Sequence, residues 1–574
     1  MSNSLTQEDI RGLSSYHNDP LFVEKTDSLY LAAGGIRETL FIKRRENSSK
    51  ADYNGWLSSG IGFKESSAKQ TVLSDEDWNS LLSESNPDLD SLNGHFICAR
   101  WREKYIEFYT DQLGIRTLFL AQLPGKVVFS TRLEWIARYT GYNEIDFTAF
   151  GSHWLLFNQL SHRCVIKNII KLGQRGKAVC IPDSIRTEHT LWKPESSRSK
   201  NFEVSAILSG FLNPSVFKPF SLSLSLSGGL DSRVLLSLLT SGSDNSFSVL
   251  SLGSEENPDV IIAKKITQKE NLDLIHRFDP INNTHDCLKR LFEYCSSVPV
   301  LAPASSILFH QYYPQLYDQK LCIIDGAFGE IGRRRFLNKI LYKGRKSLVT
   351  KDISEVFTNF CYSRAAIFTP ETEDMMKKGA FEDIDVLLNT EPGIDEVGIE
   401  NFLELIAIRT RLPNAYSYEQ SRLDGIIPYY MPYVQPLFLN KIFELPVRER
   451  KSGRLYKRII RKSSTSLTRF PLVKKNTTYP FRCSYLQSIL YTKLKSKWGL
   501  TYNDRSQIEF LKLMSDYVQD TLRSQEVKNC DYYDYEKVNS MIGDFYKGDE
   551  TRALEVDWWL SFHCWYKSLR DRVL

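Results

Sequence analysis

Residues 221–239, SLSLSLSGGLDSRVLLSLL, join a strand pattern to a helix pattern through two glycines. The alternation of serine and leucine predicts a half-buried strand, and the leucine-rich run after Asp231 predicts a helix. The glycines let the backbone turn tightly and approach a ligand closely. Because a helix N-terminus presents unpaired N–H groups and a positive dipole, the stretch predicts an anion-binding loop at the end of a strand.

The side chains of this loop match a phosphate ligand accompanied by a cation. Ser227 and Ser232 add hydroxyl donors beside Gly228 and Gly229. Asp231 would repel a phosphate unless a cation lay between them, so we expect it to bind Mg²⁺. The segment is not a Walker loop, which needs G-x-x-x-x-G-K-[ST]. The plainer alternative is a glycine-rich turn followed by a Ser/Asp helix cap.

The pattern of the chain changes near residue 200. Earlier residues form short apolar or alternating runs, such as HFICARW, YIEFYT and KVVFST, which predict a β-rich region. The polar segment 192–201 is the predicted linker. Beyond it, strand patterns alternate with helical ones and predict a parallel sheet with crossover helices; helices dominate from about residue 350. The aromatic stretch DWWLSFHCWYKSL has helical spacing and predicts core packing.

Length and composition set limits on the class of protein. A chain of 574 residues exceeds one ordinary core, so we expect two domains. The net charge of +5 neither requires nucleic acid nor excludes an anionic ligand. The ten cysteines form no metal-binding pattern and are expected to be reduced core thiols. The sequence shows no apolar leader and no membrane-spanning window, so we expect a cytoplasmic protein.

The loop hexapeptide, residues 227–232, resembles the pyrophosphate loop of the ATP pyrophosphatase superfamily. Later motifs resemble the asparagine synthetase family (class II, asparagine synthetase B-like), and this resemblance spans most of the chain. Residues 248–266 are similar to the family's second strand, acidic stretch and helix. Residues 322–332, CIIDGAFGEIG, are similar to its S-G-E-G-x-D-E segment, with Asp325 in place of serine and Glu330 at the second metal-binding aspartate.

The resemblance implies a site for ATP and Mg²⁺. The nucleotide is expected at the residues that match the family's loops, which are Leu226, Ser227, Gly228, Gly229, Asp231, Ser232, Leu252, Gly253, Asp325 and Gly326. Mg²⁺ is expected between Asp231 and Glu330, where the longer glutamate side chain would move the metal. No motif identifies the base that deprotonates the amine; Glu355 is a candidate from its distance along the chain.

Two later segments extend the resemblance. Residues 409–436 are similar to the family's R-x-x-L-P and R-x-P-F-L-D motifs, with Gln435 at the position of the final acid. Residues 453–462, GRLYKRIIRK, are similar to G-x-x-K-x-x-L-R-K. Their order and spacing add specificity to matches that are individually short.

Lysines and arginines of the second half are the expected cationic groups. Residues 470–481, FPLVKKNTTYPF, resemble the segment that supplies an active-site lysine. The spacing to the following proline favours Lys474 as the catalytic residue, and adjacency keeps Lys475 as the alternative. Eight Lys or Arg in residues 448–462 and the triplet 333–335 predict a solvated helix face, an electropositive wall around phosphates, or both.

The N-terminal part has its own resemblance. Residues 92–101, 109–121 and 126–136 are similar to motifs of the family's glutaminase domain, which implies an N-terminal-nucleophile fold with αββα layers. That chemistry needs an N-terminal cysteine whose α-amine acts as the base, whereas this chain has Ser2. The glutamine clamp is missing, its nearest match being residues 53–56, and the first strand is expected only at about Ser28. We therefore expect a degenerate domain without glutaminase activity.

Together these features predict an α/β protein with two domains. Residues 1–192 would form the inactive glutamine amidotransferase-like domain. Residues 202–574 would form a doubly wound, parallel-sheet ATP pyrophosphatase domain with a helical extension over about 484–574. The predicted activity is that of an ATP-dependent amide ligase, which activates a carboxylate as an acyl-adenylate, releases pyrophosphate and couples the acyl group to an amine or ammonia.

Three alternatives stay open at this point. One is an intramolecular cyclase of the β-lactam synthetase or lasso-peptide type, as found in natural-product biosynthesis. The second is a tRNA-modifying relative, which would need catalytic cysteines or an RNA-binding module. The third is a non-catalytic nucleotide-binding scaffold, which would explain the departures from the family's motifs at Glu330, Gln435 and Ser2. The expected partners are a small-molecule or peptide carboxylate, an amine and, as open options, a partner enzyme of a biosynthetic cluster and a second copy of the chain. Neither nucleic acid nor a membrane is expected.

Overall fold

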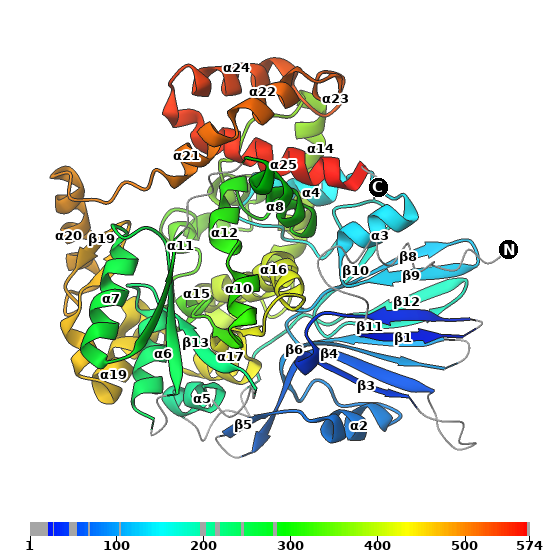
Figure 1. The fold of residues 1–574 in the computed structure, drawn as a ribbon, viewed down its shortest axis with the longest axis horizontal. Helices are drawn as coiled ribbons and strands as arrows, with labels where there is room; N and C mark the ends of the chain where they lie inside the picture. Colours follow the sequence, from blue (N-terminus) through cyan, green and yellow to red (C-terminus); the bar gives the residue numbers. More distant parts are fainter. Residues whose placement is uncertain are drawn as a thin grey trace.

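A computed structural model describes residues 21–26, 28–44, 54–66, 69–102, 105–195, 203–212, 219–242, 246–278 and 284–570. Figure 1 shows antiparallel sheets of the N-terminal part on the right, a parallel sheet on the left, and C-terminal helices at the top. The chain is therefore a mixed α/β protein with a helical C-terminal region, as predicted.

A seven-stranded antiparallel sheet dominates the N-terminal region. Its strands lie in the order β12-β11-β7-β6-β4-β3, and β5 pairs with β4. Their bounds are Leu40–Arg44 (β3), Gly55–Ser66 (β4), Lys69–Val72 (β5), Asn93–Trp101 (β6), Ile106–Thr110 (β7), Lys177–Ile181 (β11) and Ser184–Glu188 (β12). A three-stranded sheet consists of β10 (Ile170–Leu172), β8 (Leu118–Leu123) and β9 (Lys126–Ser130).

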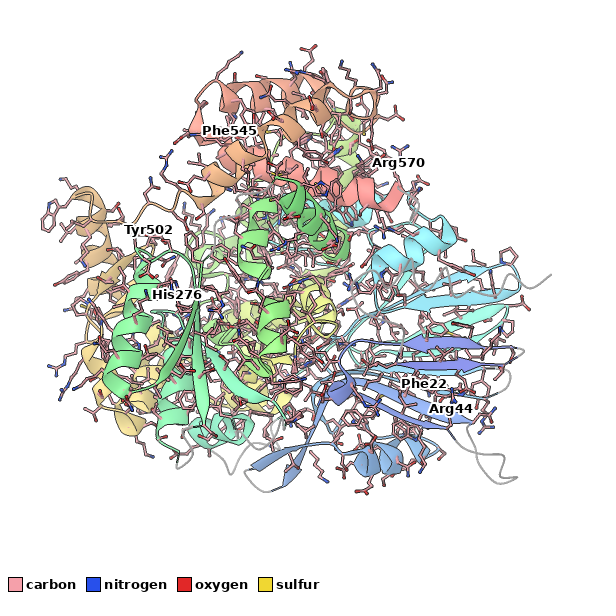
Figure 2. The ribbon with its side chains drawn as sticks, viewed as in Figure 1. Phe22, Arg44, His276, Tyr502, Phe545 and Arg570 are labelled. Atoms are coloured by element: carbon pink, nitrogen blue, oxygen red, sulfur yellow. The ribbon has the colours of Figure 1, made fainter. Side chains whose placement is uncertain are left out.

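The first described strand begins earlier than the sequence predicts. We expected it at about Ser28, whereas β1 (Phe22–Lys25) pairs antiparallel with β2 (Tyr30–Ala33). The Arg44 guanidinium lies 4.8 Å from the centre of the Phe22 ring and helps to hold this hairpin on the sheet edge (Figure 2). The expectation was wrong because four residues with two charges show no clear alternation. Ser2 lies outside the described residues, as does the first residue of the segment 53–56.

The two antiparallel sheets pack face to face, with a helix on each outer side. Alternate residues of β6 point to opposite faces, so Ile97 packs toward Leu118 and Leu120 of the small sheet while Phe96 packs toward Trp78. Trp78 belongs to α2 (Asp75–Ser83), and α3 (Leu133–Thr140) covers the other face of the small sheet. The described N-terminal region thus has four layers: helix, sheet, sheet and helix.

The second half contains the predicted parallel sheet. Its order is β15-β14-β13-β16-β17, and every neighbouring pair is parallel. The strands are Ser221–Ser225 (β13), Phe247–Leu252 (β14), Asp273–Arg277 (β15), Leu321–Ile324 (β16) and Tyr429–Tyr430 (β17). The crossovers carry α6 (Asp231–Thr240), α7 (Pro258–Glu270), α8 (Thr284–Ser297), α9 (Ile307–His310) and α10 (Tyr313–Asp318). The direction of winding reverses between β13 and β16, the place where open α/β sheets bind ligands.

Helices fill most of the remaining chain. They are α4 (Phe147–Leu155), α5 (Val204–Phe211), α11 (Asn338–Lys343), α12 (Arg345–Val349), α13 (Ile353–Phe360), α14 (Pro370–Leu388), α15 (Ile394–Ile406), α16 (Ser417–Leu423), α17 (Pro436–Glu444), α18 (Val447–Arg450), α19 (Arg454–Ser463), α20 (Tyr485–Lys497), α21 (Ser506–Leu513), α22 (Ser515–Arg523), α23 (Gln525–Lys528), α24 (Tyr535–Tyr546) and α25 (Ala553–Arg570). A π-helical segment, Ala407–Tyr416, joins α15 to α16.

One core joins the two predicted domains. Helix α25 carries the DWWLSFHCWYKSL stretch, whose Trp559 and Phe562 are buried as predicted, and it packs on α8 and α4 (Figure 1). Helices α4 and α14 cross at glycines: a Cβ on Gly151 would lie 2.0 Å from the Met376 carbonyl oxygen, and one on Gly379 would lie 2.0 Å from that of Thr148. The N-terminal helix α4 is therefore packed tightly against the second half of the chain.

The predicted linker is also packed where it begins. Trp192 is fully buried; its backbone N–H donates to Gln174 Oε1 (3.0 Å) and its backbone carbonyl accepts from Arg409 Nε (2.9 Å). Residues 196–201 of the linker lie outside the described residues. All ten cysteines are free and seven are buried, whereas Cys361 is exposed and Cys483 and Cys530 are partly exposed, so the prediction of core cysteines holds for seven of them. Among the described residues, no helix combines the length and apolar character needed to cross a membrane.

Candidate functional site

The loop between β13 and α6 is closed by its own side chains. The Ser227 N–H donates to Ser232 Oγ (3.2 Å), the two hydroxyls are hydrogen-bonded at 3.1 Å, and the Gly229 N–H donates to Ser227 Oγ (3.2 Å). The Gly228 N–H donates to Asp259 Oδ1 (2.6 Å), and burial raises the pKa of this carboxyl. Asp259 was not among the residues predicted from the sequence, although its place in the first turn of α7, after Asn257-Pro258, is typical of a capping residue. Its carboxylate holds a loop amide that an anion would need.

The loop meets the segment after β16 through two glycines. A Cβ on Gly326 would lie 3.0 Å from the Ser232 nitrogen, and a Cβ on Gly329 would lie 2.6 Å from the Asp231 Cβ. Only glycine permits such an approach. The structure thus brings together, at the switch point of the sheet, two segments that are about a hundred residues apart in the sequence.

Asp231 has an asymmetric environment. Arg333 forms an ion pair with its Oδ2, whereas no donor among the described residues reaches its buried Oδ1. Burial raises the pKa of Asp231 to about 6; Glu330 adds to this rise and Arg333 opposes it. The Tyr433 hydroxyl donates to the Asp231 carbonyl (2.8 Å) and fixes the first turn of α6.

Asp231 and Glu330 could hold a magnesium ion only together with further ligands. Glu330, in the 3₁₀ turn Gly329–Arg333, is close enough to raise the pKa of both Asp231 and Asp325. Within the described residues, no cluster of three His, Cys, Asp or Glu side chains could bind a metal alone. Mg²⁺ commonly retains waters and takes one or two carboxylates together with phosphate oxygens, so Asp231 Oδ1 and Glu330 fit that role.

The structure separates the two candidate lysines. Both lie on the hairpin of β18 (Leu472–Lys474) and β19 (Thr477–Tyr479). The Lys474 Nζ lies 3.3 Å from Ser488 Oγ and 4.8 Å from the centre of the Tyr485 ring. Burial lowers the pKa of Lys474, and the neighbouring cations Arg335, Lys475 and Arg333 lower it further. Lys475 is exposed at the hairpin turn with a left-handed φ of 49°.

The hairpin is attached to the glycine-rich loop. The Val473 N–H donates to the Gly228 carbonyl (2.9 Å). The buried Arg233 guanidinium, on α6, donates to the carbonyls of Phe470 (2.8 Å), Pro471 (2.8 Å) and Gly228 (3.2 Å). These bonds fix the hairpin that carries Lys474 beside the loop. Arg233 was not among the sequence candidates, because its role depends on carbonyls more than 230 residues away.

A strongly cationic pocket of about 40 Å³ opens beside this hairpin. Its lining includes six cationic side chains and no acidic one; the cations are Arg333, Arg334, Arg335, Lys451, Lys457 and Lys474. Arg334 is paired with the buried Glu404, whereas no described residue forms an ion pair with Arg335. The basic run 448–462 therefore divides: Lys451 and Lys457 line the pocket, and Arg454 and Arg461 are exposed on α19, as predicted for a solvated helix face. A role of the lining residues in binding phosphates stays a prediction.

A second hollow lies at the end of the neighbouring strands. Gly253 follows β14 with a φ of 121°, and its carbonyl lies 2.7 Å from His276 Nε2; next to it Ser254 Oγ is hydrogen-bonded to the Tyr502 hydroxyl (2.7 Å). Figure 2 shows His276 and Tyr502 beside these strands. A cavity of about 400 Å³ is lined here by Glu255, His276, Arg277, Phe278 and Gln315. The sequence motifs did not indicate these side chains.

Asp325, where the related motif has serine, is engaged by the protein itself. Its Oδ2 accepts a hydrogen bond from the Tyr429 hydroxyl (2.5 Å) and its Oδ1 accepts from the Ala327 N–H (2.7 Å). Burial raises the pKa of this carboxyl. Asp325 therefore orders the turn that leads to Gly326.

Two other sequence candidates lie elsewhere. Gln435 is fully buried; its amide donates to the Met431 carbonyl (3.0 Å) and its Oε1 accepts from the Gly94 N–H (2.8 Å). A carboxylate could not donate to Met431, which gives a physical reason for glutamine here. Glu355 is exposed in the first turn of α13, a helix that packs on α11 and α14, and no contact of the described residues joins it to the loop.

No protein-family model matches this chain, and no curated protein is detectably similar to it. Gly326 lies against the loop 227–232, Glu330 lies close enough to Asp231 to raise its pKa, and the hairpin of Lys474 is bonded to the loop. Lys475 and Glu355 are exposed.

Proposed function

We propose that the protein is an ATP-dependent amide ligase of the asparagine synthetase type. A substrate carboxylate attacks the α-phosphate of ATP and forms an acyl-adenylate and pyrophosphate; an amine then displaces AMP and forms the amide. The observation that carries this proposal is the approach of Gly326 to the glycine-rich loop at the switch point between β13 and β16, together with the hydrogen bond that joins the Lys474 hairpin to the same loop.

The architecture supports the same assignment. The strand order of the parallel sheet and the loop after its first strand suit an ATP pyrophosphatase domain over residues 202–574. The helix–sheet–sheet–helix layers support a degenerate N-terminal-nucleophile domain over residues 1–192. Since ATP is the substrate, we place the protein in the cytoplasm.

The chain's own groups would act in defined ways. The amides and hydroxyls of residues 227–232 hold the β- and γ-phosphates once the Gly228 amide leaves Asp259. Backbone at Leu226, Leu252, Gly253 and residues 325–326 holds the nucleoside. Lys474 donates to the α-phosphate and then to the developing oxyanion, where a fixed cation in a partly buried site is most effective. Mg²⁺ bound by Asp231 and Glu330 supplies charge neutralisation for pyrophosphate.

In this proposal the N-terminal domain has no glutaminase activity of its own. The amine is then free ammonia, ammonia from a partner enzyme, or an amine of the substrate itself. The last case makes the protein an intramolecular cyclase.

A non-catalytic nucleotide-binding protein is the second candidate. The ion pair of Arg333 with Asp231 and the hydrogen bond of the Gly228 amide to Asp259 favour it, because both occupy groups that Mg²⁺ and phosphate would use. It would bind nucleotide without turnover.

The product of ATP distinguishes these functions. We would incubate the full chain with ATP, Mg²⁺, ammonia and a panel of carboxylic acids and acidic peptides. ATP labelled at the α-phosphate separates AMP from ADP, and ATP labelled at the γ-phosphate separates pyrophosphate from orthophosphate. The proposal requires AMP and pyrophosphate in equal amounts, abolished in an Asp231→Ala variant that remains folded. ADP and orthophosphate would disprove adenylation, and binding of a fluorescent ATP analogue without any turnover would favour the second candidate.

A further inference from the structure

Helix α20 presents an apolar face that no described residue covers. Leu486, Leu490 and Trp498 are 72%, 61% and 67% exposed, and Tyr491, Leu494 and Leu500 are exposed as well. Figure 1 shows α20 at the left edge of the molecule, outside the parallel-sheet region. Six large apolar side chains within fifteen residues form a continuous patch, which marks an interaction surface.

The spacing of these residues places them on one side of the helix. Leu486, Leu490 and Leu494 follow at intervals of four, and Trp498 continues the row at the helix end, so they form one stripe. The opposite side holds the buried Ser488 and Thr492. That inner side is fixed to the protein by the bonds of Ser488 to Lys474 and of Lys495 to the Thr478 carbonyl (2.8 Å). The stripe therefore points away from the cationic pocket.

The surroundings of the stripe are cationic. Residues 480–503 contain Arg482, Lys493, Lys495 and Lys497 and no acidic residue. Lys493 and Lys497 are exposed, and none of the ion pairs among the described residues includes them. Across the pocket mouth, which Tyr342 and Ser484 both line, α11 and α12 add the exposed cations Lys339, Lys343, Arg345 and Lys346.

An exposed apolar stripe flanked by lysines fits an anionic lipid surface better than the other partners. A symmetric dimer through α20 would set the same stripe and the same lysines against each other, with no acidic residue in 480–503 to neutralise them. A nucleic acid would neutralise the lysines but leave the leucines and Trp498 in water. An anionic lipid surface takes both, since leucine and tryptophan enter the boundary between headgroups and acyl chains while lysines contact the headgroups.

We propose that α20 is an interfacial helix that docks the protein on an anionic membrane surface through Leu486, Leu490, Leu494 and Trp498. This inference is independent of the proposed reaction, because it concerns the side of α20 that faces away from the pocket. It replaces the expectation that no membrane would be a partner.

Vesicle flotation tests the inference with the full chain. We expect the protein to float with vesicles of equal parts phosphatidylcholine and phosphatidylglycerol, to stay behind with phosphatidylcholine alone, and to be released by high salt. The double variant Leu490→Ser/Leu494→Ser should weaken partitioning by about tenfold or more. The variant Lys493→Gln/Lys497→Gln should weaken it by a similar factor on the anionic vesicles alone.

Matched controls separate docking from unfolding and self-association. Val386→Ser removes an equally exposed apolar side chain (67% exposed) on α14 and should float like the wild type. All variants should keep the wild-type melting temperature, since the positions are exposed. A wild type that ignores anionic vesicles would overturn the inference. So would a wild-type dimer in light scattering that Leu490→Ser/Leu494→Ser converts to a monomer, because the face would then belong to a second copy.

Discussion

Arg333 forms an ion pair with Oδ2 of Asp231, while Oδ1 of the same carboxylate is buried without a donor among the described residues. One oxygen of the carboxylate is thus paired within the protein, and the other has no hydrogen-bond partner among the described residues. An unpaired buried carboxylate oxygen is costly, and a cation bound there, as in the proposed magnesium site, would remove that cost. Arg333 would compete with such a cation for the carboxylate.

Removal of Arg333 should therefore favour a metal. We predict that Arg333→Gln binds Mn²⁺, used as a paramagnetic substitute for Mg²⁺, about tenfold more tightly than the wild type, because the competing cation is gone. Asp231→Asn should lose this binding. Electron paramagnetic resonance of free Mn²⁺ measures both, and equal affinities in all three proteins would show that Asp231 is not a ligand.

The two adjacent lysines should behave differently. Lys474→Ala should lower the rate of pyrophosphate release by about two to three decades with little change in nucleotide affinity, because its ammonium meets charge that develops in the transition state. Lys475→Ala is the control, since that side chain is exposed at the turn. Steady-state kinetics and binding of a fluorescent ATP analogue distinguish the two effects. Near-normal turnover in both variants would remove the hairpin from the mechanism.

The two loop glycines should also differ. A Cβ on Gly228 would lie 2.2 Å from Val473 Cγ2, so Gly228→Ala must displace the hairpin that carries Lys474. A Cβ on Gly229 meets only the rotatable Ser227 hydroxyl, at 3.0 Å. We expect Gly228→Ala to lower pyrophosphate release about a hundredfold, Gly229→Ala less than about tenfold, and Val473→Ala to rescue part of the Gly228→Ala loss. A Gly228→Ala enzyme as active as the Gly229→Ala enzyme would contradict this coupling.

The burial of Lys171 predicts that the free energy of unfolding depends on pH. Its ammonium, on β10, is buried and donates to Asn414 Oδ1 (2.7 Å), and burial lowers its pKa from 10.5 to about 7. Between pH 7 and 10.5 the unfolded chain binds a proton that the folded chain lacks, so this group makes the protein more stable as the pH rises. Through this group the free energy of unfolding rises by at most about 1.4 kcal/mol per pH unit.

Lys171→Met should remove this slope. We would compare melting temperatures of the wild type and the variant between pH 7 and 9. Burial raises the pKa of thiols such as Cys98 in the folded protein, so they also contribute to the dependence on pH, but this contribution is common to both proteins and cancels in the difference. The wild type should gain stability relative to the variant across this window. A constant difference between the two proteins would show that Lys171 keeps its ordinary pKa in the folded state.

Much of the fold could be predicted from the sequence. The strands around HFICARW, YIEFYT and SLSLSLS, the helix after Asp231 and the parallel sheet all have local signals, because side-chain periodicity and glycine positions report the backbone directly. The early strand β1 has no such local signal, because its conformation depends on pairing with β2. Of the site, the loop 227–232 and the preference for Lys474 over Lys475 came from motif and spacing.

Other parts were decided only by tertiary structure. Arg333 pairs with Asp231 across 102 positions, and Asp259 holds the Gly228 amide across 31, so no local pattern shows either contact. The helices α20 and α25 show that burial of an apolar face also depends on tertiary structure. Both carry apolar residues at helical spacing, and the sequence determines that each is a helix with an apolar face. Whether that face is core or contact surface depends on what lies against it: α8 and α4 cover α25, whereas the leucines of α20 meet solvent.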